Sequence, residues 1–356
     1  MKIRYDSPLI HYSGRIDLDE KGAHWYFPST SATVKFKGTN IGFTVTDSMC
    51  WGIITLGYVI DGRLGRVPLL PENNGKSAFY IAAADLEPDK EHTFTLFKRM
   101  AANHSCIISD LETDGEFIGF TEHYDLALEF YGDSVSAGEV SEADDFVGRG
   151  DPANADAIYD NSYFSYTWQV SRLLNAKFHN ISQGGIAVFD GTGYFHMPQT
   201  IGMESVYDKA CYFPEAGEPT SWDFSKYVPD IAVFALGQND NHNSVTNEND
   251  IDIYDKNVRQ NWKDGYKRII TDICGKYEKL GKNIDVILLT TVLMHDPEWD
   301  KAIDEAVQEL CRQGIKAHHF IFSRNGAATP GHPRRAEHSE MAFELAAEID
   351  RIRKIK

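Results

Sequence analysis

The sequence predicts an α/β protein with two unlike parts, an all-β part in residues 1–120 and an α/β part in residues 121–356. Short β-rich runs separated by turn residues fill the first part, a pattern typical of a sandwich or jelly roll. From residue 126 onward, apolar runs alternate with helical patterns, which indicates a parallel sheet covered by helices on both faces. A length of 356 residues also favours two domains over one.

The first part is divided by glycine, proline, asparagine and aspartate into short segments that suit strands. Alternating apolar and polar residues within a segment predict a strand with one face toward a core. The expected strands lie within 24–28, 32–38, 41–47, 52–62, 77–83, 92–99 and 105–115.

The second part has continuous apolar runs that suit strands buried on both faces of a parallel sheet. These runs lie at 126–132, 176–182, 230–237, 284–292 and 316–323. Between and after them, apolar residues recur at the period of an α-helix. The expected helices lie at 165–174, 258–277, 299–313 and 337–354.

The composition excludes several classes of function. A formal net charge of -18 would repel nucleic acid and anionic membrane surfaces, so we expect neither as a partner. Five cysteines without CxxC spacing suit buried thiols in a reducing compartment, and no opening apolar run resembles a leader. We therefore expect a cytoplasmic protein, although a chain trimmed of its leader would look the same. No metal-type spacing or phosphate-binding glycine loop is present, so we expect no metal and no cofactor.

Four loops that follow predicted strands carry the residue types that acyl transfer requires. They contain Ser134, the pair Gly184 and Gly185, Asn239, and His332. A serine hydroxyl becomes a nucleophile when a neutral imidazole takes its proton. A glycine N–H, the serine's own N–H and an asparagine amide are suitable donors to the oxyanion that then forms. Taken singly, these residues have simpler interpretations: a helix cap for Ser134, a turn residue for Asn239 and a packed loop residue for His332.

In order, the four loops resemble the conserved blocks of the SGNH, or GDSL-type, hydrolase superfamily. The matching segments are "GDSVSAG" (132–138), "SQGG" (182–185), "GQND" (237–240) and "GHP" (331–333). The resemblance implies a flavodoxin-like three-layer α/β domain, with Ser134 as nucleophile, His332 as base, and no cofactor. Asp133 and Asp240 would then organise their loops.

The front part resembles the sandwich that precedes the hydrolase domain in carbohydrate esterase family 2. The segments that resemble it are "YSGRID", "HWYFPSTSATVKFKGTNIGFTV", "FKR" and, before the third block, "WDFSKYVPDIAVFALGQND". The resemblance implies removal of O-acetyl groups from plant polysaccharides or oligosaccharides of the xylan, mannan or glucomannan type. Because no leader is seen, imported acetylated oligosaccharides are the expected substrate. Two alternatives are an acylhydrolase of lipids or thioesters on the same scaffold and a non-catalytic carbohydrate-binding relative.

The chain departs from the superfamily pattern in two blocks. An aspartate usually stands two or three residues before the histidine, but here those positions hold Pro330 and Thr329. Either a backbone carbonyl near these residues orients His332, or a carboxylate from elsewhere in the chain does so. In the second block, which often reads Ser-Gly-x-Gly, we assign the oxyanion N–H to Gly185, with Gly184 close behind.

Two tryptophans are candidate platforms for a sugar ring, because aromatic faces stack on the apolar faces of pyranoses. Trp299 is expected in the loop after the 284–292 strand, on the rim of the site, although it could equally pack at a helix start. Trp51 follows a strand of the sandwich and reaches the site if that domain leans over it. The acidic run Glu142, Asp144 and Asp145 is expected to be a solvated loop.

Overall fold

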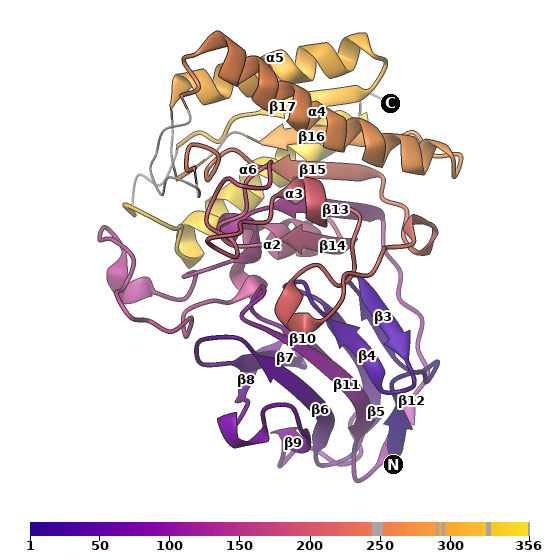
Figure 1. Ribbon diagram of the computed structural model, residues 1–356. Coiled ribbons are helices and arrows are strands. Elements are labelled where there is room, and N and C mark those ends of the chain that lie inside the picture. Colours follow the sequence, from indigo (N-terminus) through magenta and orange to yellow (C-terminus); the bar gives the residue numbers. More distant parts are fainter. Residues whose placement is uncertain (244–251, 290–291, 294–295, 325–328, 355–356) are drawn as a thin grey trace.

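The computed structural model describes residues 1–243, 252–289, 292–293, 296–324 and 329–354. Two antiparallel sheets are followed in the chain by a parallel sheet with helices on both sides (Figure 1). Within the described residues, no helix combines the length and the apolar character needed to cross a bilayer.

The front part forms two six-stranded antiparallel sheets. One sheet has the order β3-β4-β11-β6-β9, with β1 paired to β11, and the other has the order β12-β5-β10-β7-β8, with β2 paired to β5. The strands are β1 (Lys2–Arg4), β2 (His11–Ser13), β3 (Ile16–Asp19), β4 (Gly22–Trp25), β5 (Ser31–Lys37), β6 (Ile41–Met49), β7 (Thr55–Ile60), β8 (Arg63–Pro68), β9 (Ser77–Ala83), β10 (His92–Lys98), β11 (His104–Glu112) and β12 (Glu116–Ile118).

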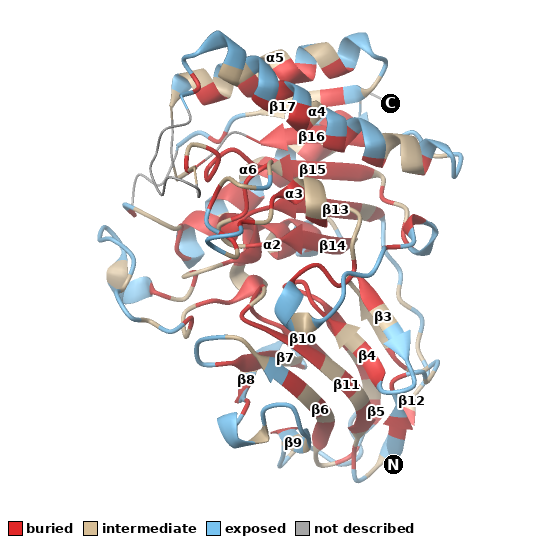
Figure 2. Ribbon diagram, viewed as in Figure 1, coloured by how far each residue is buried: buried red, intermediate tan, exposed pale blue. Residues whose placement is uncertain are grey.

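The two sheets pack face to face as a sandwich. Buried and more exposed residues alternate along β6 and β11 (Figure 2), as expected for strands with one face toward a core. Phe43 and Ile108 of one sheet meet Phe36 and Phe94 of the other in a single buried cluster. The antiparallel sandwich agrees with the expectation from the sequence, and its assignment as a jelly roll stays a prediction, as does the boundary between residues 120 and 121.

The second part contains one five-stranded parallel sheet. Its strands are β13 (Leu126–Gly132), β14 (Ala176–Ser182), β15 (Ile231–Ala235), β16 (Asp285–Leu289) and β17 (Lys316–Phe320). Their spatial order, β14-β13-β15-β16-β17, is 2-1-3-4-5 in chain order, which is the flavodoxin-like order. Gly132 pairs with Ser182 on one side and with Ala235 on the other, so the loops after these three strands leave the same edge of the sheet.

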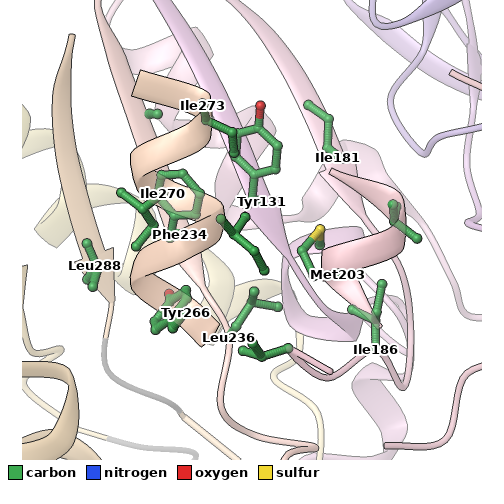
Figure 3. Packing of buried hydrophobic residues seen from close by; sticks show 14 of the residues in the cluster. Tyr131, Ile181, Ile186, Met203, Phe234, Leu236, Tyr266, Ile270, Ile273 and Leu288 are labelled. Atoms are coloured by element: carbon green, nitrogen blue, oxygen red, sulfur yellow. The ribbon is translucent and has the colours of Figure 1, made fainter. Parts of the chain in front are cut away.

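Helices cover both faces of this sheet and complete three layers. They are α1 (Ser134–Ala137), α2 (Tyr166–Leu173), α3 (Met203–Val206), α4 (Lys256–Glu278), α5 (Pro297–Arg312) and α6 (Arg335–Lys354). Short 3-10 helices occur at Pro71–Asn73, Asp144–Phe146, Ser162–Phe164, Pro214–Ala216 and Phe224–Lys226. The apolar residues of α3, α4 and α5 share one buried cluster with one face of the sheet, and those of α2 and α6 share another with the opposite face. In Figure 3, Tyr131 and Phe234 of the sheet lie beside Ile270 of α4.

A buried arginine joins the sandwich to the parallel sheet. The Arg15 side chain is fully enclosed, and its guanidinium donates to Glu129 Oε1 at 3.1 Å and to the Tyr131 hydroxyl at 2.9 Å. The same guanidinium donates to the backbone carbonyls of Tyr207 at 2.7 Å and Lys209 at 3.0 Å. Because Glu129 lies on β13, an inner strand of the parallel sheet, this contact fixes the sandwich against that sheet.

Candidate active site

Ser134 begins α1 close behind the carboxyl end of strand β13. Asp133 caps this short helix, since its Oδ1 accepts the Val135 N–H at 3.1 Å. The other carboxylate oxygen of Asp133 accepts the Gln238 side-chain N–H at 2.6 Å, and burial raises the Asp133 pKa to about 6. The helix-cap interpretation of Ser134 is therefore wrong. Asp133 performs that task, and the Ser134 hydroxyl is left for another partner.

That partner is His332. The His332 Nε2 atom lies 2.7 Å from Ser134 Oγ, and its Nδ1 atom lies 2.6 Å from Asp151 Oδ2. An ionised carboxylate only accepts hydrogen bonds, so Nδ1 carries the proton and Nε2 is free to accept the proton of Ser134. The side chain of Ser134 is almost completely enclosed, at 4% exposure of the residue, so this contact lies in a site with little water.

Asp151 supplies the carboxylate that the last block lacks. Thr329 and Pro330 hold the positions where the superfamily usually has an aspartate. Of the two groups expected to orient His332, a nearby backbone carbonyl or a carboxylate from elsewhere in the chain, the structure favours the carboxylate. The buried Arg334 holds it in place, because its Nη1 donates to Asp151 Oδ1 at 2.8 Å and to the His332 carbonyl at 2.7 Å. Asp151 was not expected from the sequence. It stands 181 residues before His332 in an irregular acidic loop, where no periodicity or spacing distinguishes it.

The charges around His332 favour its protonated form. Burial alone would lower the His332 pKa, but the hydrogen bond to Asp151 and the nearby charges of Glu139, Asp151 and Asp133 raise it above 6.5. Burial likewise works against the charge of Asp151, yet the bonds to His332 and Arg334 lower the Asp151 pKa to about 2. The ionised Asp151 carboxylate therefore stabilises the imidazolium form of His332.

The second and third loops meet beside this serine. Gly185 adopts φ +73°, a left-handed conformation that favours glycine. Asn239 lies next to it, because its side-chain amide donates to the Ile186 carbonyl at 3.0 Å. Within the described part of the chain, no backbone carbonyl accepts the N–H of Ser134 or of Gly185.

Asp240 organises these loops, in agreement with the expectation from the sequence. Its Oδ1 accepts the Val188 N–H and the indole N–H of Trp262, each at 2.8 Å. The carboxylate thus ties the second loop to the third and to α4.

The sandwich also touches the second loop. Gln183 Oε1, at the end of β14, accepts the backbone N–H of Ala102 at 2.9 Å and the Tyr212 hydroxyl at 2.6 Å. Tyr212 in turn stacks on Phe27 of the front part, with ring centroids 4.3 Å apart. The segment that carries Gly184 and Gly185 is therefore braced from the sandwich side.

The structure corrects the expectation for Trp299 and leaves that for Trp51 open. Asp296 caps α5, so Trp299 lies in the first turn of that helix, and at 4% exposure it packs edge-on against Trp262 of α4. It is a core residue and has no free face for a sugar. Trp51 is 57% exposed, and its backbone N–H donates to the Asn103 carbonyl, one residue from the Ala102 contact with Gln183.

One group of metal-type donors occurs among the described residues, and the sequence expectation overlooked it. Asp47, His104 and Cys106 are buried in the sandwich with donor atoms within 4.8 Å of one another. His104 Nδ1 lies 2.6 Å from Asp47 Oδ1. The Lys98 ammonium is buried beside them, where desolvation lowers its pKa to about 8. Because the Lys98 ammonium already lies beside these donors, they suit an internal ion pair of the sandwich better than a metal centre.

Comparisons with known proteins agree with this architecture. Residues 12–118 match the family model for the carbohydrate esterase 2 N-terminal domain. The cellulase/esterase CelE of Acetivibrio thermocellus is 26% identical over 361 residues, an alignment that covers 97% of this chain and 39% of CelE. The chain thus spans well under half the length of that curated relative.

Solved structures extend the likeness to the whole fold. A family two carbohydrate esterase from Clostridium thermocellum, solved in complex with cellohexaose, superposes with a TM-score of 0.78 at 23% identity, covering 96% of this chain and 98% of the other. An acetyl xylan esterase from Butyrivibrio proteoclasticus superposes with a TM-score of 0.80 at 19% identity, covering 98% of each chain. The chain therefore carries the N-terminal domain of carbohydrate esterase family 2 and, over nearly its whole length, has the fold of solved family 2 carbohydrate esterases.

Proposed function

We propose that the protein is a serine esterase that removes O-acetyl groups from plant-derived oligosaccharides or polysaccharides of the xylan, mannan or glucomannan type. The observation that carries this proposal is the hydrogen-bonded chain Ser134–His332–Asp151 at the carboxyl end of strand β13. The relatives support the class of substrate, since those named above are a cellulase/esterase, a carbohydrate esterase and an acetyl xylan esterase.

The proposed reaction passes through an acetyl-enzyme. Ser134 Oγ attacks the acetyl carbonyl carbon while its proton moves to His332 Nε2, and Asp151 stabilises the imidazolium. The N–H groups of Ser134 and Gly185 and the Asn239 amide donate to the oxyanion. Gly184 precedes this donor and shapes the same turn.

The second half of the reaction reverses the proton path. His332 gives its proton to the departing sugar oxygen, so the ester C–O bond breaks and the acetyl group stays on Ser134. Water then loses a proton to His332 and attacks the acetyl carbonyl. Collapse of the intermediate releases acetate, and the proton returns to Ser134 Oγ.

Release of acetate from acetylated xylo- and manno-oligosaccharides, followed by NMR, tests the proposal. Wild-type protein is expected to release acetate, and Ser134→Ala and His332→Ala are each expected to lower the rate by about 10⁴-fold or more. Diisopropyl fluorophosphate is expected to label Ser134. A label on another serine, or full activity in His332→Ala, would contradict the assignment of roles.

A series of p-nitrophenyl esters separates this proposal from a lipid or thioester acylhydrolase. Activity is expected to fall as the acyl chain grows beyond acetate. A rise with chain length would favour the acylhydrolase. Binding of oligosaccharides without any hydrolysis of p-nitrophenyl acetate would favour a non-catalytic relative.

A further inference from the structure

A cavity separate from the active site lies between the sandwich and the parallel sheet. Its volume is about 320 Å³, at the lower end of the range of roughly 300–1,000 Å³ that is typical of small-molecule sites. From the sandwich it is lined by residues of β2, β5 and β10. From the other part it is lined by residues of α2 and by the start of β14, the edge strand of the parallel sheet nearest the sandwich (Figure 1).

The cavity lies at the opposite end of the sheet from Ser134. Ala176, the first residue of β14, lines the cavity, whereas the last residue of the same strand, Ser182, pairs with Gly132 beside the Ser134 loop. At about 3.3 Å per residue, the length of the strand separates these two ends by roughly 20 Å. A ligand of moderate size in the cavity therefore does not contact the catalytic serine.

Hydroxyl groups from neighbouring sandwich strands gather on the wall of the cavity. Ser31 and Thr33 are alternate residues of β5, so their side chains point to the same face of the sheet. Thr95 of β10 lies opposite Thr33, with the two Oγ1 atoms 2.9 Å apart. Ser13 of β2 lies opposite Ser31 in the antiparallel register, and its hydroxyl donates to the Phe178 carbonyl at 2.6 Å. Three strands thus present four hydroxyls to one cavity.

The Ser31 hydroxyl is the one in this group that has no protein partner. Ser31 is only 5% exposed, and its hydroxyl has no hydrogen-bond partner among the residues that the structure describes. A buried hydroxyl without a partner favours a ligand that can donate to it or accept from it. The Thr33–Thr95 pair also keeps free capacity, because each hydroxyl can both donate and accept. These groups suit a ligand that carries several hydroxyls of its own.

The charged groups of the lining favour a ligand without net charge. The cations Arg172 and Lys177 and the carboxylate of Glu122 all line the cavity, so an ion of either sign would meet repulsion from one of them. Two of the three are already engaged by protein groups. The Arg172 guanidinium donates to the Tyr163 carbonyl at 2.9 Å, and Glu122 Oε1 accepts the Tyr124 hydroxyl at 2.9 Å.

We propose that this cavity is a second carbohydrate site, which holds a neutral mono- or disaccharide unit against Ser31 and the Thr33–Thr95 pair. Trp168 of α2 also lines the cavity and adds apolar surface for the C–H groups of a sugar ring. Because the hydroxyls come from the sandwich and Trp168 from the other part, a bound sugar contacts both parts of the chain. The site goes beyond the esterase function proposed above and does not depend on it.

Titration of the full chain with xylobiose and with mannobiose, followed by ¹⁹F NMR of 5-fluorotryptophan, tests the site. The Trp168 resonance, assigned with Trp168→Phe, is expected to shift with half-saturation at about 0.1–10 mM of at least one disaccharide. Ser31→Ala and Thr95→Val each remove a hydroxyl and are expected to raise that concentration about 5- to 20-fold. Thr93→Val is the matched control, because Thr93 is exposed on the same strand as Thr95 and does not line the cavity. It is expected to bind as wild type.

Two further measurements accompany the titration. Circular dichroism checks that each variant is folded. The kcat/KM for p-nitrophenyl acetate is expected to stay within about 2-fold of wild type in Ser31→Ala and Thr95→Val, because both residues are remote from Ser134.

A Trp168 resonance that does not shift at about 50 mM of either disaccharide would overturn the inference. A shift that Ser31→Ala and Thr95→Val leave unchanged would overturn it as well, because the sugar would then bind elsewhere. A response to inorganic phosphate in place of the disaccharides would contradict the neutral class of ligand. Ser134→Ala is expected to abolish the esterase reaction and to leave the Trp168 titration as in wild type. Failure of the proposed function and failure of this site are therefore separate results.

Discussion

Asp151 Oδ2 lies 2.6 Å from His332 Nδ1 although 181 residues separate the two in the chain. The contact brings an acidic loop that follows α1 over the histidine loop that precedes α6. Arg334 clamps the pair by donating both to the Asp151 carboxylate and to the His332 carbonyl. The geometry makes Asp151 a positioning residue whose removal has a distinct kinetic signature.

Replacing Asp151 with asparagine is expected to lower kcat/KM for p-nitrophenyl acetate by about 10²- to 10⁴-fold. Asparagine keeps the size of the side chain but removes the charge that stabilises imidazolium, and it can hold the wrong tautomer. The exposed Asp145 of the same loop offers the control, Asp145→Asn, which is expected to behave as wild type. Equal activity in Asp151→Asn and wild type would show that the Asp151 contact does not assist His332.

The pH dependence of kcat/KM provides a separate test of the same contact. A general base works only when deprotonated, so activity requires a pH above the His332 pKa. Burial lowers this pKa, but Asp151, Glu139 and Asp133 together raise it above 6.5. The acid limb of wild type is therefore expected to have its midpoint above pH 6.5, and Asp151→Asn is expected to move that midpoint to lower pH. A midpoint that does not respond to the substitution would argue against the electrostatic role of Asp151.

Asn239→Ala is expected to reduce kcat by about 10²- to 10³-fold with little change in KM, because an oxyanion donor acts in the transition state. Its amide also donates to the Ile186 carbonyl, so the loop could shift in the variant. Circular dichroism and thermal melting check that the fold is retained. A rise in KM with unchanged kcat would instead assign Asn239 to substrate binding.

The Arg15 contact is expected to dominate the coupling between the sandwich and the parallel sheet. Arg15→Met leaves Glu129 buried without its cation, which costs about 3–5 kcal/mol of unfolding free energy. Arg4→Met removes an exposed pair with Asp6 and is expected to leave the free energy of unfolding close to that of wild type. Urea denaturation compares the two. Similar stability in both variants would show that the buried pair contributes no more than a surface one.

Substitutions of Trp51 and Trp299 are expected to have different effects, because one ring is exposed and the other is packed in the core. Trp51→Ala should raise KM for acetylated oligosaccharides about 5-fold or more and leave p-nitrophenyl acetate unaffected, if its exposed ring contacts the sugar. Trp299→Ala should destabilise the fold by about 3–5 kcal/mol and affect both substrates alike, because its ring fills a core contact with Trp262. An unchanged KM in Trp51→Ala would remove Trp51 from the binding site.

The features that the sequence predicts well are those encoded locally. The segments 126–132 and 176–182 were expected to be strands and form β13 and β14 with the same bounds, because continuous apolar runs mark buried parallel strands. Ser134 and His332 were expected to meet because both follow strands of one sheet, and the structure places them 2.7 Å apart.

The features that were missed depend on how distant segments pack. Asp151 lies in an irregular loop, so only the folded chain shows which carboxylate reaches the histidine. Glu142 of the same acidic run was expected to be solvated, but its carboxylate accepts from the buried Arg99 and from the Asn161 amide at 3.0 Å. Trp299 was placed on the rim because it follows a strand, yet its position on the apolar face of α5 directs it inward.

Through the Ala102–Gln183 hydrogen bond, the sandwich contacts the loop that carries Gly184 and Gly185. If residues 121–356 were expressed alone, the turn that carries Gly184 and Gly185 would lose one of its supporting contacts. A substitution in the sandwich near Ala102 can therefore change the position of this loop without contacting the substrate. The geometry of that loop therefore depends on both parts of the chain being present together.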